Sequence, residues 1–425
     1  MIERIKTLLA ADAGVSNYRI NQVKTESTEL FFVHQSLETV RATDTADVKV
    51  TVFVEHDGKL GDATFSVYAS YGEEKIKSEI EAAKKKASLI DNENYPLPEN
   101  ETANIPSDSN FRNFTPQELG AKIAEAVFAA EGEDGGSLNA VEVFVYKDEV
   151  RVINSRGIDK TEVKHRAMVE AIPTWTENGE SVELYECYNF TEFDAATVTA
   201  EIARRMAEVR DRYHAVKPET PPTCPVVLMI GEIGELMENL AHELNYASVY
   251  QKANAFSKGD AIQKDPTGDT LTVSLCGKML GSVNSASFDG EGCSLKDTEI
   301  VKDGVATAYY GGVRFASYLG EEPTGNLRCL RLGAGTLTEE ELSSAPYFRV
   351  ASMSGLQLDI YSDYIGGEVR LGYYFDGEKE IPMTGISLSG KLSEALSCLR
   401  LSEKTAVWEG YEGPTLALIS KMEIV

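Results

Sequence analysis

Three polar residues near the middle of the chain have the types and spacing from which a metal-dependent hydrolase could be built. Glu238, His242 and Glu243 lie on a segment whose apolar residues recur at steps of three and four, which predicts an amphipathic helix. Glu238 and His242 are four residues apart, so they share one face of that helix. His242-Glu243 begins like the H-E-x-x-H pattern, in which two imidazoles bind zinc and the Glu polarises the metal-bound water. These three residues are the catalytic candidates of the sequence.

The second half of the zinc pattern is missing. Tyr246 and Ala247 stand where the second imidazole would lie, and a third or fourth ligand has no identified source. One interpretation is a solvated acidic helix face with a single His, and then we expect neither a bound metal nor a cofactor. The alternative is a self-sufficient metal-dependent peptidase that uses Glu238, His242 and Glu243. The carboxylate oxygens of the two glutamates favour manganese or magnesium over zinc.

A short strand and a helix must position these residues. The apolar run from Pro225 to Ile230 reads as a buried strand, because it is too short to cross a membrane and ends at Gly231. The helix that follows has one apolar face and one acidic face. Its apolar positions are Ile233, Leu236, Met237, Leu240 and Leu244.

Composition excludes several classes of protein. The chain has 425 residues, 42% hydrophobic and 26% charged, which predicts a globular protein of two domains. A formal charge of −27 opposes binding to a phosphate backbone, so we expect no direct contact with nucleic acid. The first residues lack a secretory apolar segment, so we expect a cytoplasmic protein with no membrane contact. The cysteines are far apart without a C-x-x-C pair, which predicts buried thiols in a reducing compartment: Cys187, Cys224, Cys276, Cys293, Cys329 and Cys398.

The order of elements predicts an α+β protein. We expect an N-terminal α/β sandwich-like domain over residues 1–216, a stiff proline-rich linker, and a strand-rich C-terminal domain over 223–425 that contains the helix described above. Within the first domain, Asp57-Gly58 and Asn178-Gly179 predict hairpin turns, and Thr115 to Glu118 predict a capped helix start. Residues 140–153 read as two strands turned at Lys147-Asp148, and residues 91–110 as a surface connection.

Short motifs occur in a recognisable order along most of the chain. They are Asn154-Ser155-Arg156-Gly157 before a long hairpin, the Pro225 strand with its helix, Pro323-Thr324-Gly325-Asn326, Gly333-Ala334-Gly335 leading into Thr338-Glu339-Glu340-Glu341-Leu342, and Gly385-Ile386-Ser387-Leu388-Ser389-Gly390. This order resembles the TldD/PmbA family, the so-called modulators of DNA gyrase.

The resemblance implies which branch of that family to expect. The branch similar to TldD is a zinc-dependent peptidase with an H-E-x-x-x-H helix after the strand and a late Cys ligand. The branch similar to PmbA, also called TldE, lacks these ligands and pairs with the first. In this sequence the helix over 231–244 offers His242 alone, and residues 402–425 contain no cysteine. The resemblance therefore implies the PmbA side.

The function implied is a non-catalytic subunit of a two-component cytosolic metalloprotease that binds peptide or unfolded protein in a cleft. Its partner would be a TldD-like catalytic subunit or a second copy of the chain in a two-fold dimer. We expect the helix over 231–246 to line the cleft, and peptide to add to an exposed strand edge. A further alternative is a modulator of DNA gyrase that acts through protein contact, because the net charge gives no electrostatic reason to touch DNA.

Overall fold

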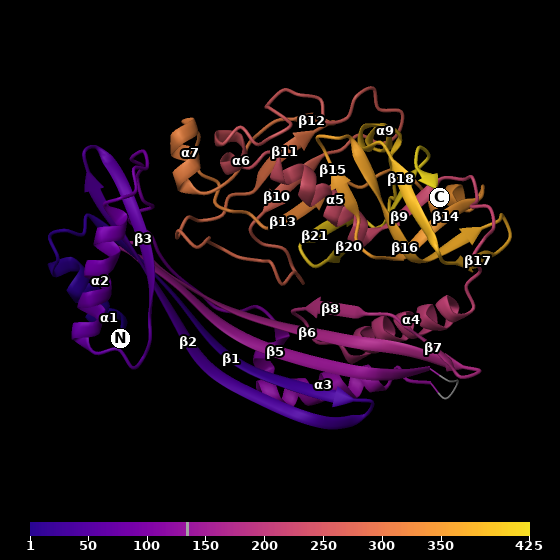
Figure 1. Cartoon of the computed structure of the whole chain (residues 1–425), viewed down its shortest axis with the longest axis horizontal. Coiled ribbons are helices and arrows are strands. Elements are labelled where there is room, and N and C mark those ends of the chain that lie inside the picture. Colours follow the sequence, from indigo (N-terminus) through magenta and orange to yellow (C-terminus); the bar gives the residue numbers. More distant parts are fainter. Residues whose placement is uncertain (133–135) are drawn as a thin grey trace.

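The first half of the chain forms one long curved sheet, here called the N-terminal sheet, which sweeps beneath the second half (Figure 1). The computed structural model describes residues 1–132 and 136–425. The strand order is β3-β2-β1-β5-β6-β4, and β7 and β8 also pair with β6. The elements are α1 (Ile2–Ala11), β1 (Asn17–Val33), β2 (Ser36–His56), β3 (Lys59–Val67), α2 (Glu73–Ala87), β4 (Thr102–Ile105), the 3-10 turn η1 (Asn110–Asn113), α3 (Pro116–Phe128), β5 (Gly136–Asn154), β6 (Asp159–Glu177), β7 (Glu180–Glu183), β8 (Glu186–Phe190) and α4 (Ala195–Tyr213).

The two faces of the N-terminal sheet have different partners. Side chains alternate between faces along a strand, and β1 and β5 are paired without a register shift. Ile20 and Leu30 of β1 therefore share a face, where Ile20 packs with α1 and α2 and Leu30 with α3 and α4. The opposite face carries Val23, Thr25 and the residues paired with them, and it turns toward the second half of the chain. We call it the cleft face.

The second half builds two sheets around a large apolar core. The β10 sheet has the order β12-β11-β10-β13-β21-β20, and the β16 sheet has the order β19-β22-β9-β14-β16-β18-β23, with β15 and β17 also paired to β16. The elements are β9 (Val226–Met229), α5 (Ile230–His242), α6 (Tyr246–Tyr250), β10 (Val273–Cys276), β11 (Thr298–Lys302), β12 (Val305–Ala306), α7 (Val313–Leu319), β13 (Cys329–Leu332), α8 (Glu339–Leu342), β14 (Tyr347–Met353), β15 (Gln357–Asp359), β16 (Tyr364–Phe375), β17 (Glu380–Met383), β18 (Ile386–Gly390), α9 (Leu392–Cys398), β19 (Arg400–Leu401), β20 (Thr405–Trp408), β21 (Tyr411–Pro414), β22 (Leu416–Ile419) and β23 (Glu423–Ile424).

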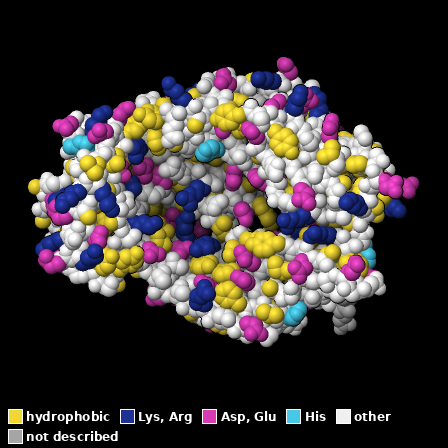
Figure 2. Space-filling model, in the orientation of Figure 1, with side chains coloured by type: hydrophobic (Ala, Val, Ile, Leu, Met, Phe, Trp, Pro, Cys, Tyr) yellow, Lys and Arg dark blue, Asp and Glu magenta, His cyan; other side chains and the backbone are white. Residues whose placement is uncertain are grey.

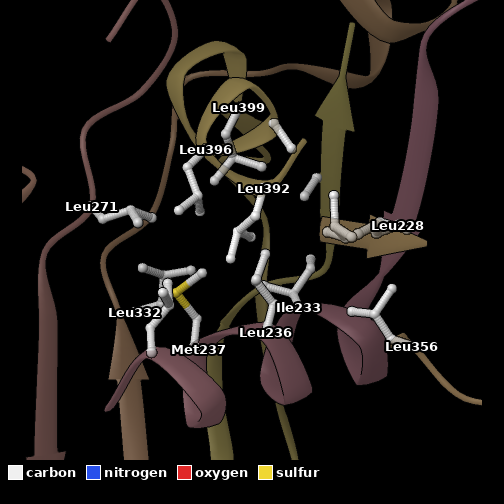
Figure 3. Packing of buried hydrophobic residues seen from close by; sticks show 14 of the residues in the cluster. Leu228, Ile233, Leu236, Met237, Leu271, Leu332, Leu356, Leu392, Leu396 and Leu399 are labelled. Atoms are coloured by element: carbon white, nitrogen blue, oxygen red, sulfur yellow. The ribbon is translucent and has the colours of Figure 1, made fainter. Parts of the chain in front are cut away.

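The apolar stripe of α5 fixes that helix in the core. Ile233, Leu236 and Met237 point toward Leu392 and Leu396 of α9 (Figure 3), and all five side chains are at most 3% exposed. Burying a side chain of this size contributes about 1.5–3 kcal/mol. The stripe therefore determines which face of α5 stays available for chemistry.

The fold confirms the predicted α+β class with a strand-rich C-terminal half. The capping box of Thr115 and Glu118 is present at the start of α3. Asp57 and Asn178 adopt the left-handed conformation in their hairpin turns, with φ of 49° and 53°. Among the residues that the structure describes, no helix is both long and apolar enough to cross a membrane.

Two local predictions are wrong. Lys147-Asp148 is not a turn, because β5 continues through it: the Asp148 carboxylate receives hydrogen bonds from Thr25 on one neighbouring strand and Arg166 on the other. Residues 91–110 are more than a surface connection, because they contain β4, which pairs in parallel with β6. In the same segment Tyr95 is 7% exposed and packs in an apolar cluster with Val313 of α7.

Candidate functional site

Two of the three candidate residues of α5 are exposed, and the third is buried. Glu238 and His242 are exposed, whereas Glu243 is 7% exposed. Although Glu238 is exposed, the protein around its carboxyl removes part of its hydration and so raises its pKa, and the neighbouring carboxylates of Glu409 and Glu235 raise it further. Glu238 and His242 both lie in the described part of the chain, and the structure shows no hydrogen bond or ion pair between them.

Glu243 and His242 bond to the segment that follows the helix. The Glu243 carboxylate accepts hydrogen bonds from the backbone N–H of Ala255 and, at 3.3 Å, from the Tyr361 hydroxyl. His242 Nε2 lies 3.4 Å from Ser248 Oγ of α6. Within the described part of the chain, no group of three or more His, Cys, Asp and Glu side chains is placed to hold a metal ion. A catalytic role for Glu238, His242 and Glu243 stays a prediction.

A cavity of about 620 Å³ lies between the cleft face of the N-terminal sheet and the second half of the chain. In the space-filling view the molecule is hollowed between its two halves, and Lys and Arg side chains gather in the hollow (Figure 2). The walls come from β1, β5 and β6 on one side and from the loop over residues 277–285, here called the 277–285 loop, on the other. The cavity brings together residues more than one hundred positions apart in the sequence.

Two pairs of charged residues in this cavity form ion pairs. Glu162 is 2% exposed and bonds to Lys278 and, at 3.1 Å, to the backbone N–H of Ser287. Asp148 bonds to Arg166 at 3.1 Å. Lys164 differs from these, because its side chain forms no ion pair or hydrogen bond with any residue that the structure describes.

The ionisation of the unpaired cation and its neighbour His165 follows from their surroundings. Burial lowers the pKa of Lys164, the Glu162 carboxylate opposes this shift, and Lys278 adds to it. Burial also lowers the pKa of His165, whose Nδ1 lies 2.8 Å from Ser107 Oγ. His165 is therefore a neutral side chain of the cavity wall near neutral pH.

Contacts outside the cavity also join the two halves of the chain. Lys160 is 1% exposed and reaches Glu101 at 2.7 Å and Ser294 at 2.8 Å. The Tyr373 hydroxyl bonds to Asp211 at 2.9 Å. We call this cavity the cleft.

Comparison with known proteins identifies the family. Residues 221–425 match the family model described as the PmbA/TldA metallopeptidase C-terminal domain. Residues 221–425 therefore belong to the TldD/PmbA family. A search of curated proteins finds no match.

Solved structures of this family share the fold over the whole chain. TldE from Thermococcus kodakarensis has 15% identity and a TM-score of 0.82, covering 99% of this chain and 100% of that one. A protein from Thermotoga maritima described as a candidate modulator of a DNA gyrase has 16% identity and a TM-score of 0.80, with 100% of both chains covered. A protein of similar description from Bacteroides thetaiotaomicron has 12% identity and a TM-score of 0.79, covering 100% and 98%. At such identities the likeness shows the fold of the TldD/PmbA family and does not separate its branches.

One titratable group of this TldD/PmbA chain was missed by sequence reasoning. Glu232 lies in the first turn of α5, and burial raises its pKa to about 7, with Glu235 adding to the shift and Arg205 of α4 opposing it. Acidic residues are common in the first turn of any helix, where they favour the helix dipole. The sequence therefore carried no signal that burial would raise the pKa of this carboxyl.

Proposed function

We propose that this chain is a PmbA/TldE-like, non-catalytic subunit of a cytosolic TldD/PmbA-type metalloprotease assembly and binds peptide in the cleft. The proposal rests on the polar residues of α5, which lack a second imidazole and include a carboxylate that is already hydrogen-bonded. The helix has one imidazole, His242, where the catalytic pattern needs two, and the Glu243 carboxylate is engaged with Ala255 and Tyr361. A residue that anchors the backbone in this way is not free to polarise a metal-bound water.

Peptide binding is supported by two edge strands, β20 and β8. β20 is the last strand of the β10 sheet, and Thr405, Ala406 and Val407 in it are exposed. β8 pairs only with β6 in the N-terminal sheet, and its Asn189 donates a hydrogen bond at 2.9 Å to Glu409, which follows β20. An extended peptide can pair with such an edge through main-chain hydrogen bonds, which require no particular sequence.

The assembly we propose pairs this chain with a TldD-like catalytic subunit, or with a second copy in a two-fold dimer. In either case a strand-rich half with open edges gains from a partner that covers them. The subunit would present peptide or unfolded protein to the metal centre of the other chain. Its own contribution is binding and orientation.

Backbone pairing is tested with a matched pair of peptides. An extended eight-residue peptide of mixed composition is titrated into the chain, alone and with the partner subunit, and compared with the same peptide N-methylated at alternate amides. Each backbone hydrogen bond contributes about 0.5–1.5 kcal/mol net, so losing two should weaken binding about tenfold. Equal affinity for the two peptides, or no binding in either setting, would overturn the proposal.

The partnership is tested by purification. The chain is co-expressed with a candidate partner that carries an intact H-E-x-x-x-H helix, and we expect the two to elute together and to cleave peptide faster than the partner alone. A partner that elutes alone with full activity would rule out the subunit role.

A further inference from the structure

Two cysteines that lie 53 positions apart in the sequence (276 and 329) are direct neighbours in the β10 sheet. Cys276 ends β10 and pairs in antiparallel register with Cys329, which begins β13. The residues beside them, Leu275 and Leu330, point into the apolar core of the second half. Because side chains alternate along a strand, both thiols project from the opposite face of the sheet.

The 277–285 loop covers the two thiols. Cys276 is 1% exposed, Cys329 is 0% exposed, and Met279 of the loop packs against both. Ser282 Oγ lies 3.6 Å from Cys329 Sγ. The other side of this loop lines the cavity, and Leu280 at its tip is 81% exposed. One loop therefore separates a thiol pair from the cleft.

We propose that Cys276 and Cys329 form a redox-active dithiol, which a low-molecular-weight disulfide oxidises to an intramolecular disulfide beneath the 277–285 loop. Directly opposed residues of an antiparallel pair have Cα atoms about 4.5 or 5.5 Å apart. Disulfides span Cα separations of about 4.4–6.8 Å. At either of these Cα separations, Cys276 and Cys329 can form a disulfide bond without movement of the strands.

The local charges favour one thiol as the first nucleophile. The hydrogen bond between the thiols raises the pKa of Cys276 and lowers that of Cys329 to about 7, and Lys164 and Arg331 also favour the Cys329 thiolate. The thiolate is the reactive form of cysteine. Cys329 therefore attacks first, once the loop has opened to admit the oxidant.

The two steps of the exchange balance. The Cys329 thiolate attacks one sulfur of the external disulfide, a mixed disulfide forms, and the other sulfur leaves as a thiolate. That thiolate takes the proton of Cys276, whose sulfur then attacks Cys329 Sγ and expels the second thiolate, which takes a proton from water. Two protein thiols are oxidised, and one external disulfide is reduced to two thiols. When the disulfide forms, Cys329 loses its S–H group, which is a partner of the Ser282 hydroxyl of the loop.

The test maps the product in the full chain. The folded protein is incubated with oxidised glutathione, denatured in the presence of an alkylating reagent, digested and analysed by mass spectrometry. We expect a Cys276–Cys329 cross-linked peptide at least about tenfold more abundant than any other cysteine pair. The remaining cysteines should carry the alkyl group: Cys187, Cys224, Cys293 and Cys398.

Matched variants separate the pair from general thiol oxidation. Cys187→Ser should keep the cross-link, and Cys329→Ser should abolish it. If Cys329→Ser does not fold, Cys276→Ala serves in its place, and the product map of the unaltered chain decides independently. Glutathione attached to Cys187 or Cys224, with Cys276 and Cys329 recovered as alkylated thiols after prolonged oxidation, would overturn the proposal.

Discussion

Substitutions on α5 should separate the residue that holds the fold from those that are exposed to solvent. Glu243 is 7% exposed and accepts hydrogen bonds from the Ala255 backbone and the Tyr361 hydroxyl. A hydrogen bond to a charged group contributes about 1.5–3 kcal/mol, and a donor left without a partner adds a further penalty. We expect Glu243→Ala to lower the free energy of unfolding by about 2–3 kcal/mol.

The matched change is the double substitution Glu238→Ala with His242→Ala. Both side chains are exposed, so we expect a cost within about 0.5 kcal/mol. Glu243→Gln keeps one acceptor oxygen and should fall between these values. Urea unfolding followed by circular dichroism and by intrinsic fluorescence measures all three variants, with midpoints compared at equal slope. A double variant that loses more than about 2 kcal/mol, or a harmless Glu243→Ala, would show that the assignment of the two faces is wrong.

Three further changes test the packing of the molecule. Burial raises the pKa of Glu232 from 4.5 to about 7, so the stability that its protonated form provides is fully present below pH 4.5 and is lost as the pH rises through 7. At pH 8, Glu232→Gln should therefore be more stable than the unaltered chain by up to roughly 3 kcal/mol. A difference between the urea midpoints of the two proteins that stays the same from low to high pH would contradict this prediction. A Cβ at Gly335 would lie 2.1 Å from the Leu401 carbonyl oxygen, whereas a Cβ at Gly333 would lie 3.7 Å from its nearest neighbour. Thermal unfolding should therefore show Gly335→Ala destabilised by about 1–3 kcal/mol and Gly333→Ala nearly unchanged. Equal melting temperatures for the two variants would refute the close approach at Gly335. We propose that the domains meet at the linker over 217–222. Protease cleavage there should leave fragments that elute together in gel filtration, because Ser294 of the second fragment bonds to Lys160 and Glu101 of the first. Fragments that separate without denaturant would exclude such docking.

Local chemistry in the sequence predicts turns and helix starts well. Asp57-Gly58 and Asn178-Gly179 form the hairpin turns that their left-handed preference indicates, and the Thr115 capping box is present. Lys147-Asp148 shows the limit of such reasoning. Two adjacent charges in a strand pattern suggest a turn, but partners on neighbouring strands, Thr25 and Arg166, keep Asp148 within a long strand.

The candidate site was predictable only in part, for the same physical reason. The helical period correctly identified the buried stripe of α5, because the stripe depends on residues close in sequence. The roles of Glu243 and Glu232 depend on residues from other elements, Tyr361 and Arg205. Strand pairing likewise brings Cys276 beside Cys329, and no spacing in the sequence indicates that contact.

The central claim is that this chain binds peptide and leaves cleavage to another subunit. The most direct measurement is hydrolysis of a quenched fluorescent peptide by the purified chain, with zinc, manganese or magnesium added in turn. We expect no turnover above the buffer rate with any of these ions. Turnover that requires one of them and is lost in the Glu238→Ala, His242→Ala double variant would contradict it and establish a self-sufficient metallopeptidase.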